Sequence, residues 1–116
     1  MATILYVEDH PPAQLLMQAI ISEMTPHTLI QALSGEEARR AAAAERPDLY
    51  ILDLDLPDGD GVTLAQVLRA IHPAPVILVS AYAENVHAEA LDYDYLAKPL
   101  DPDDVARIID RSLNAF

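Results

Sequence analysis

The acidic side chains most suited to chemistry follow directly after an apolar run in the middle of the chain. Residues 49–52 are apolar, Asp53 comes next, and Pro57, Gly59 and Gly61 then mark a tight turn. A continuous apolar run is typical of a strand buried on both faces. We therefore expect Asp53 to be a reactive carboxylate where a central strand leaves the core.

Other polar side chains that could bind a metal or an anion lie at the ends of three further strand-like runs. They are Glu8, Asp9, Ser80 and Lys98. In an open parallel sheet, ligands bind outside the carboxyl ends of the strands. We expect these side chains to meet Asp53 at that edge.

Three converging carboxylates repel one another, and a buried carboxylate is costly unless a cation compensates it. Glu8, Asp9 and Asp53 offer oxygen ligands only, which suits Mg²⁺ and also Mn²⁺. Lys98 would add a fixed positive charge on the other side. A carboxylate held between a metal ion and a lysine is suited to meet a phosphoryl group, whose oxygens both cations would neutralise.

Aspartate is a phosphoryl-accepting nucleophile that needs no general base, because it is already ionised at neutral pH. Asp53 is therefore the expected nucleophile. The Ser80 hydroxyl could bond to a phosphoryl oxygen once that group is present. Since such a contact exists in one state only, it could drive a conformational switch.

Segments with helical periodicity alternate with the apolar runs and indicate the elements that hold these residues. A helix after Pro11 is expected to turn one apolar face inward: Leu15, Leu16, Ala19, Ile20 and Met24. Ser34 and Glu37 form a capping-box pattern for a second helix. Further inward faces are expected in the third and last helices: Leu64, Val67, Leu68 and Ile71, then Val105, Ile108, Ile109 and Leu113.

Five strands alternating with helices predict an α/β domain with a five-stranded parallel sheet covered by helices on both faces. The strands are expected at about residues 4–7, 28–33, 49–53, 76–79 and 93–96. A chain of 116 residues is long enough for one core, so we expect a single domain over 1–116.

Composition excludes several classes of function. The formal net charge is −12, with only seven lysines and arginines, which opposes binding of nucleic acid or anionic lipid by this domain. Without cysteine there can be no disulfide and no thiolate metal site. No apolar run approaches a membrane span and no signal segment is visible, so we expect no membrane association and a cytoplasmic location.

Taken together, the motifs resemble the receiver domain of two-component response regulators over essentially the whole chain. They are Glu8-Asp9, the segment from Asp53 to Gly61, Ser80-Ala81, and Tyr95 to Pro99. The resemblance implies a flavodoxin-like, doubly wound fold with sheet order 2-1-3-4-5.

Residue by residue, the resemblance implies that Asp53 is the phosphoacceptor. Glu8 and Asp9 would hold Mg²⁺ together with Asp53 and the backbone carbonyl of Asp55. Lys98 would bind the phosphoryl group.

The resemblance also implies a switch and a special backbone feature. Ser80 would be the switch hydroxyl, and Tyr95 the aromatic side chain that moves with it. Pro99 would follow a cis peptide bond.

One departure from the family lies between Ser80 and Lys98, where the chain is shorter by about one helical turn, or roughly 3.6 residues. We therefore expect a shortened or irregular fourth helix within residues 82–91. Such a change would alter the surface through which many relatives signal.

The expected function is that of a monomeric, stand-alone receiver. It would take a phosphoryl group from a sensor histidine kinase or a histidine phosphotransfer protein onto Asp53 and then lose it by hydrolysis. Such a protein phosphorylates and dephosphorylates itself and is not a turnover enzyme. Its output would pass through protein contacts or through draining phosphate from a shared kinase.

Two alternatives remain open from the sequence. One is a receiver-like module that binds a partner without phosphorylation. The other is a haloacid-dehalogenase-like phosphatase, because Asp55 lies two residues after Asp53 as the second aspartate of that family does. The remaining acids and the histidines are interpreted as caps, turn residues or surface residues: Asp58, Asp60, Asp101, Asp103, Asp104, His10, His27, His72 and His87.

Overall fold

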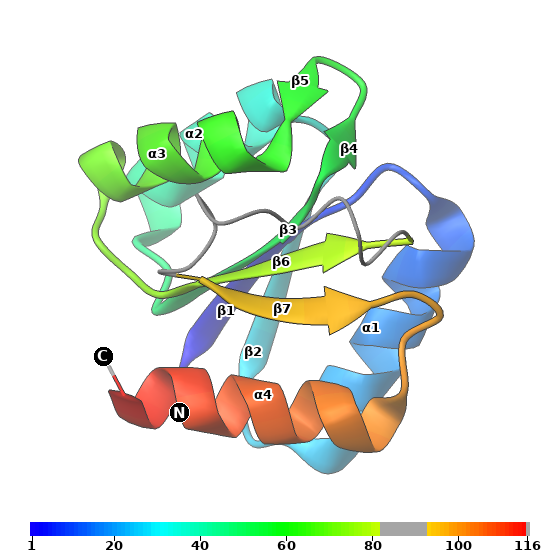
Figure 1. The fold of residues 1–116 in the computed structure, drawn as a ribbon. Helices are drawn as coiled ribbons and strands as arrows, with labels where there is room; N and C mark the ends of the chain where they lie inside the picture. Colours follow the sequence, from blue (N-terminus) through cyan, green and yellow to red (C-terminus); the bar gives the residue numbers. More distant parts are fainter. Residues whose placement is uncertain (82–92, 116) are drawn as a thin grey trace.

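The computed structural model describes residues 1–81 and 93–115 (Figure 1). The first half contains β1 (Thr3–Val7), α1 (Pro11–Met24), β2 (Thr28–Ala32), α2 (Gly35–Glu45) and β3 (Leu49–Asp53). The second half contains β4 (Asp55–Leu56), β5 (Gly59–Asp60), α3 (Gly61–Ile71), β6 (Val76–Ser80), β7 (Asp94–Ala97) and α4 (Pro102–Ala115). In this part of the chain no helix is long and apolar enough to cross a membrane.

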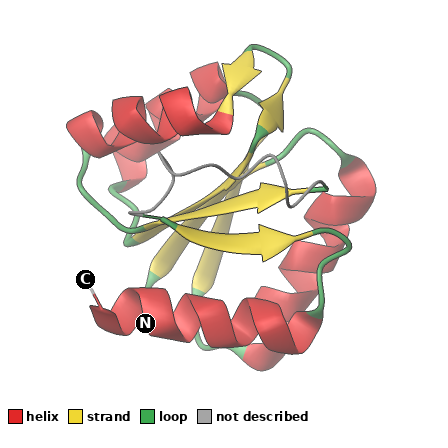
Figure 2. Cartoon of the chain, in the orientation of Figure 1, coloured by secondary structure: helices red, strands yellow, loops and turns green. Residues whose placement is uncertain are grey.

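Five strands form one parallel sheet in the order β2-β1-β3-β6-β7. The predicted order 2-1-3-4-5 is confirmed, with β6 and β7 as the fourth and fifth strands. Helices α1 and α4 cover one face of the sheet, and α2 and α3 cover the other (Figure 2). Right-handed crossovers between parallel strands produce this three-layer arrangement.

Alternate residues along each strand supply two separate cores, as the period of two requires. Ile4, Tyr6, Ile51, Ile77 and Val79 pack with α1 and α4. Leu5, Val7, Tyr50, Leu52 and Leu78 pack with α2 and α3. Strand β3 is buried along its whole length, which confirms the prediction for residues 49–53.

The predicted inward face of α1 is wrong in part. Leu15 is 73 % exposed and Leu16 and Met24 are also exposed, whereas the buried residues are Met17, Ile20 and Ile21. Apolar residues lie on more than one face of this helix, so periodicity alone did not select the face that packs against the sheet. In α3, Leu64 and Leu68 are buried as predicted, but Ile71 in the last turn is exposed.

The helix starts agree with the predicted caps, with one change. The Ser34 hydroxyl accepts a hydrogen bond from the Glu37 N–H at 3.2 Å. The Glu37 carboxylate accepts from the N–H of Leu33 at 2.9 Å, one residue before the position that a capping box uses. Asp101 accepts from the N–H of Asp104 at 3.2 Å at the start of α4.

The short antiparallel hairpin of β4 and β5 was not predicted, because strands of two residues carry no readable periodicity. The irregular fourth helix expected within residues 82–91 lies outside the described residues.

Candidate functional site

The four strand ends predicted to carry chemistry meet at one edge of the sheet. Asp53 ends β3 and pairs in register with Val79 of the neighbouring β6. Ser80 ends β6 and is buried, and its carbonyl accepts from the Lys98 N–H at 2.9 Å. Glu8 follows β1, which is the other neighbour of β3. The sheet order therefore places Asp53 between the other three residues.

Three carboxylates gather at this edge. One side-chain oxygen each from Glu8, Asp9 and Asp53 lies within 4.8 Å of the other two. Glu8 and Asp53 are only 1 % and 5 % exposed, whereas Asp9 is exposed. Oxygen donors alone, with one open side, fit a hard divalent cation that keeps some of its waters. The predicted Mg²⁺ or Mn²⁺ ligands are thus brought together.

Lys98 bridges two of these carboxylates. Its Nζ lies 2.7 Å from Glu8 Oε1 and 3.2 Å from Asp53 Oδ2. Partial burial lowers the pKa of Lys98, but the hydrogen bond to Glu8 and the charges of Asp53 and Glu8 outweigh this, so the pKa is raised. Lys98 therefore stays positively charged beside Asp53.

At Asp53 the effect of burial on the pKa outweighs the charge of Lys98. Burial, followed by the neighbouring Glu8 carboxyl, raises the pKa of Asp53 to about 6. The Asp55 N–H, which donates to Asp53 Oδ1 at 3.1 Å, and the charge of Lys98 act in the opposite direction. A second cation bound beside Asp53 would favour the charged carboxylate and lower its pKa again.

Two residues that sequence reasoning missed hold Glu8 in place. The Tyr6 hydroxyl donates to Glu8 Oε1 at 3.2 Å, and burial raises the pKa of this hydroxyl, so it remains a donor. The Gln14 side-chain amide on α1 donates to the Glu8 carbonyl at 2.6 Å. Tyr6 could have been found, because residues two apart on a strand face the same side. Gln14 gave no comparable signal.

The remaining predicted positions differ in how far the structure describes them. The peptide bond between Lys98 and Pro99 is cis, as the resemblance implied. Tyr95 is half-buried on β7, and its buried hydroxyl oxygen has no hydrogen-bond partner among the described residues. The Asp55 side chain is exposed and only its N–H contacts Asp53. The metal contact of the Asp55 carbonyl and the switch role of Tyr95 stay predictions.

The loop after Asp53 is fixed by the acids that were interpreted as caps. Asp60 accepts from the Thr63 N–H at 2.8 Å and begins α3. Asp58 accepts from the N–H groups of Gly35 and Glu36, so it caps α2 and not the helix that follows it. These hydrogen bonds, from Gly35 and from Thr63 first, lower the pKa of Asp58 and of Asp60.

A mostly apolar hollow of about 230 Å³ adjoins the lysine. It lies between the first turns of α1 and the segment after β7, and its lining residues are His10, Pro12, Ala13, Leu16, Lys98, Pro99 and Leu100. Leu16 also lines a second hollow along α1. The exposed apolar side chains of α1 therefore begin beside the carboxylate cluster.

Comparisons with known proteins agree with this geometry. The family model described as "Response regulator receiver domain" matches residues 4–110. Transcriptional regulatory protein KdpE of Mycobacterium tuberculosis is 36 % identical over 110 residues, which cover 90 % of this chain and 47 % of that protein. Response regulator protein PilR of Pseudomonas aeruginosa is 35 % identical, covering 84 % of this chain and 23 % of that protein. The chain thus spans about half the length of these curated relatives or less.

Solved structures give the same result. A response regulator receiver domain from Methylobacillus flagellatus superposes with a TM-score of 0.88 at 27 % identity, covering 96 % of this chain and 98 % of that chain. A putative response regulator from Chloroflexus aurantiacus has a TM-score of 0.87 at 27 % identity, with 97 % and 98 % coverage.

Proposed function

Because this chain belongs to the family of response regulator receiver domains, we propose that it accepts a phosphoryl group on Asp53 from a histidine kinase or a histidine phosphotransfer protein. Family and fold set aside the haloacid-dehalogenase-like alternative. The observation that carries the proposal is the buried Asp53 carboxylate, held 3.2 Å from Lys98 Nζ and clustered with Glu8 and Asp9.

The transfer exchanges one bond to phosphorus for another. An Asp53 carboxylate oxygen attacks the phosphorus of a phosphohistidine, and a P–O bond forms as the P–N bond breaks. The electron pair of that bond returns to the imidazole nitrogen of the donor. In the later hydrolysis, a water oxygen attacks phosphorus, the bond to Asp53 breaks, and the carboxylate leaves with its electron pair. One hydrogen of the water stays on the attacking oxygen, and the other passes to another oxygen of the released phosphate.

This chain's residues support both steps. Lys98 offers positive charge where the phosphoryl oxygens would lie, and Ser80 ends the adjacent strand with a hydroxyl that can donate to one of them. Bound Mg²⁺ or Mn²⁺, held by Glu8, Asp9, Asp53 and the carbonyl of Asp55, would neutralise further charge on those oxygens. The hydrogen bond from Tyr6 keeps Glu8 oriented for this task.

The apolar hollow beside Lys98 supports a protein as the phosphoryl donor. Leu16 and Leu100 line it, and Lys98 forms one of its walls. A partner helix seated over Leu16 would therefore present a phosphorylated side chain directly to Asp53. Output through protein contacts or through a drain on a shared kinase would follow from the same acceptor chemistry.

Mass measurement after incubation with Mg²⁺ and a small phosphodonor such as phosphoramidate tests the proposal. The wild-type protein should gain one phosphoryl group, and Asp53→Ala should gain none. Asp110→Ala, which removes an exposed acid of α4, is the matched control and should be phosphorylated like the wild type. Unmodified wild-type protein would favour the alternative of an interaction module that works without phosphorylation.

A further inference from the structure

The hairpin that follows Asp53 is too short to define its own position. Strands β4 and β5 form only two residue pairs, Asp55 with Asp60 and Leu56 with Gly59. Even longer isolated two-stranded hairpins are marginally stable in water. The position of this hairpin must therefore depend on contacts that it makes with the rest of the domain.

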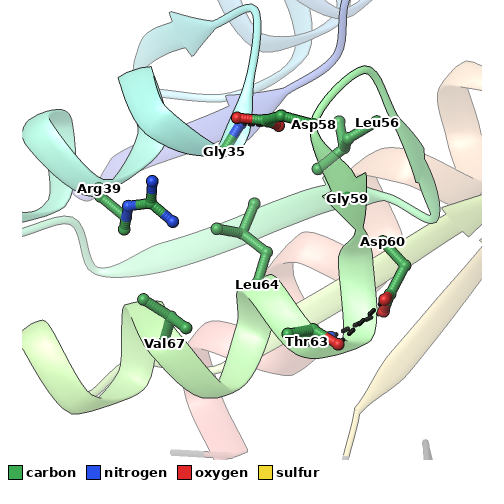
Figure 3. A pocket seen from close by; sticks show the side chains of 9 residues that line it. All are labelled: Gly35, Arg39, Leu56, Asp58, Gly59, Asp60, Thr63, Leu64 and Val67. Atoms are coloured by element: carbon green, nitrogen blue, oxygen red, sulfur yellow. Dashed lines mark hydrogen bonds between the residues drawn. The ribbon is translucent and has the colours of Figure 1, made fainter.

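A hollow of about 260 Å³ lies between the hairpin, α2 and α3, as Figure 3 shows. Its lining residues are Gly35, Arg39, Leu56, Asp58, Gly59, Asp60, Thr63, Leu64 and Val67. Leu56 of the hairpin is partly buried and packs against the core, and polar contacts provide further anchors.

One anchor reaches an element that is remote in the sequence. Asp58 Oδ1 accepts from the Gly35 N–H at 2.8 Å, and Asp58 Oδ2 accepts from the Glu36 N–H at 3.1 Å. The first N–H groups of a helix have no partner within the helix. Ser34 already takes the N–H of Glu37. Asp58 thus accepts hydrogen bonds from the two N–H groups at the start of α2 that Ser34 does not bind. We call this contact the Asp58 clamp.

The glycine at the start of α2 fits the same interpretation. A Cβ at Gly35 would lie 3.1 Å from Asp58 Oδ1, tighter than ordinary van der Waals contact. The backbone of Gly35 does not itself require glycine, since among the described glycines only Gly59 has a positive φ. The missing side chain therefore allows the Asp58 carboxylate to approach the helix.

The other end of the hairpin touches the nucleophile. The Asp55 N–H donates to Asp53 Oδ1 at 3.1 Å, and the Asp55 carbonyl is the proposed backbone ligand of the metal. Only Leu56 and Pro57 separate Asp55 from Asp58. We propose that Asp58 is a positioning residue for the metal site, because its clamp on α2 holds the Asp55 backbone in the orientation that cation binding needs. This inference rests on the proposed function.

Two variants at the same helix start separate positioning from simple capping. Asp58→Ala frees the hairpin, whereas Ser34→Ala removes a cap of α2 and leaves the hairpin contact intact. Calorimetric titration with Mg²⁺ alone should show an affinity about tenfold weaker for Asp58→Ala, as for partners that orient metal ligands. Ser34→Ala should bind Mg²⁺ like the wild type, even though denaturant unfolding shows a comparable loss of stability in both.

Conservative variants sharpen the test. Asp58→Asn keeps an oxygen for Gly35 but places an amide toward Glu36, so its Mg²⁺ affinity should lie between those of wild type and Asp58→Ala. Gly35→Ala should weaken Mg²⁺ binding without touching the hairpin sequence. Equal Mg²⁺ affinity in Asp58→Ala and Ser34→Ala would overturn the inference while leaving the proposed function standing. A wild type that binds no Mg²⁺ would overturn both.

Discussion

At Asp53, the proposed role as phosphoacceptor conflicts with the stability of the fold. Burial and Glu8 raise the pKa of Asp53 from the ordinary 3.8 to about 6. Between these two values the folded state binds more protons than the unfolded state, so stability falls as the pH rises through this window. Above about pH 6 the buried charge of Asp53 lowers the free energy of unfolding by its full amount, and below about pH 3.8 this cost is absent.

Asp53→Asn should therefore stabilise the metal-free protein at neutral pH. Removing the buried charge is expected to raise the free energy of unfolding by roughly 1–3 kcal/mol at a pH near 7.5. The gain should disappear near pH 4, where the wild-type carboxyl is already protonated. Denaturant unfolding with EDTA at both pH values measures this, and a variant less stable than wild type at the higher pH would contradict the assigned pKa.

Among the elements, the start of α3 lies against the backbone of Asp53. Gly61 begins this helix, and a Cβ at that position would lie 2.5 Å from the carbonyl oxygen of Asp53. The obstacle is backbone, which cannot rotate away as a side chain can. Only glycine allows β3 to pass so directly into the hairpin and then into α3.

Gly61→Ala is expected to destabilise the domain by about 1–3 kcal/mol, as overpacking in a core does. It should also weaken Mg²⁺ binding, because the end of β3 must shift. Asp60→Ala is the control, since it removes the cap of the same helix without adding an atom beside Asp53, and it should cost about 1 kcal/mol. Unfolding midpoints and Mg²⁺ titrations report both effects. Equal stability of Gly61→Ala and wild type would show that the backbone relieves the clash without a loss in the free energy of unfolding.

The sequence determines these elements unevenly. Strand β3 and Asp53 were predictable because a continuous apolar run needs burial on both faces, and the other strand ends followed from the parallel sheet. The buried face of α1 was not predictable, because Leu15 and Met17 are both apolar and only packing against the sheet distinguishes them. The Asp58 clamp joins residues 23 positions apart, and such contacts leave no local pattern.

Across the whole molecule, the sheet separates two halves that both reach Asp53. The half with α2 and α3 carries the hairpin and its clamp, and the half with α1 and α4 carries the apolar hollow beside Lys98. The whole chain has a formal charge of −12. Within this charged surface, the exposed leucines of α1 form an apolar contact area next to the site, where the proposed phosphoryl-donating protein would bind.

Leu16→Ser should therefore slow phosphoryl transfer from a protein donor by about tenfold, which corresponds to the loss of roughly 1.4 kcal/mol of contact. Transfer from phosphoramidate should be unchanged, since a small donor needs no docking face. Ile71→Ser is the control: Leu16 is 38 % and Ile71 41 % exposed, so both changes remove a similar apolar contact with the fold. Radiolabel transfer from a phosphorylated kinase or phosphotransfer protein measures both rates. If Leu16→Ser and Ile71→Ser slow transfer from the protein donor equally, α1 is not the docking face. A docking role of Leu16 requires that its substitution alone slows transfer from the protein donor and leaves transfer from phosphoramidate unchanged.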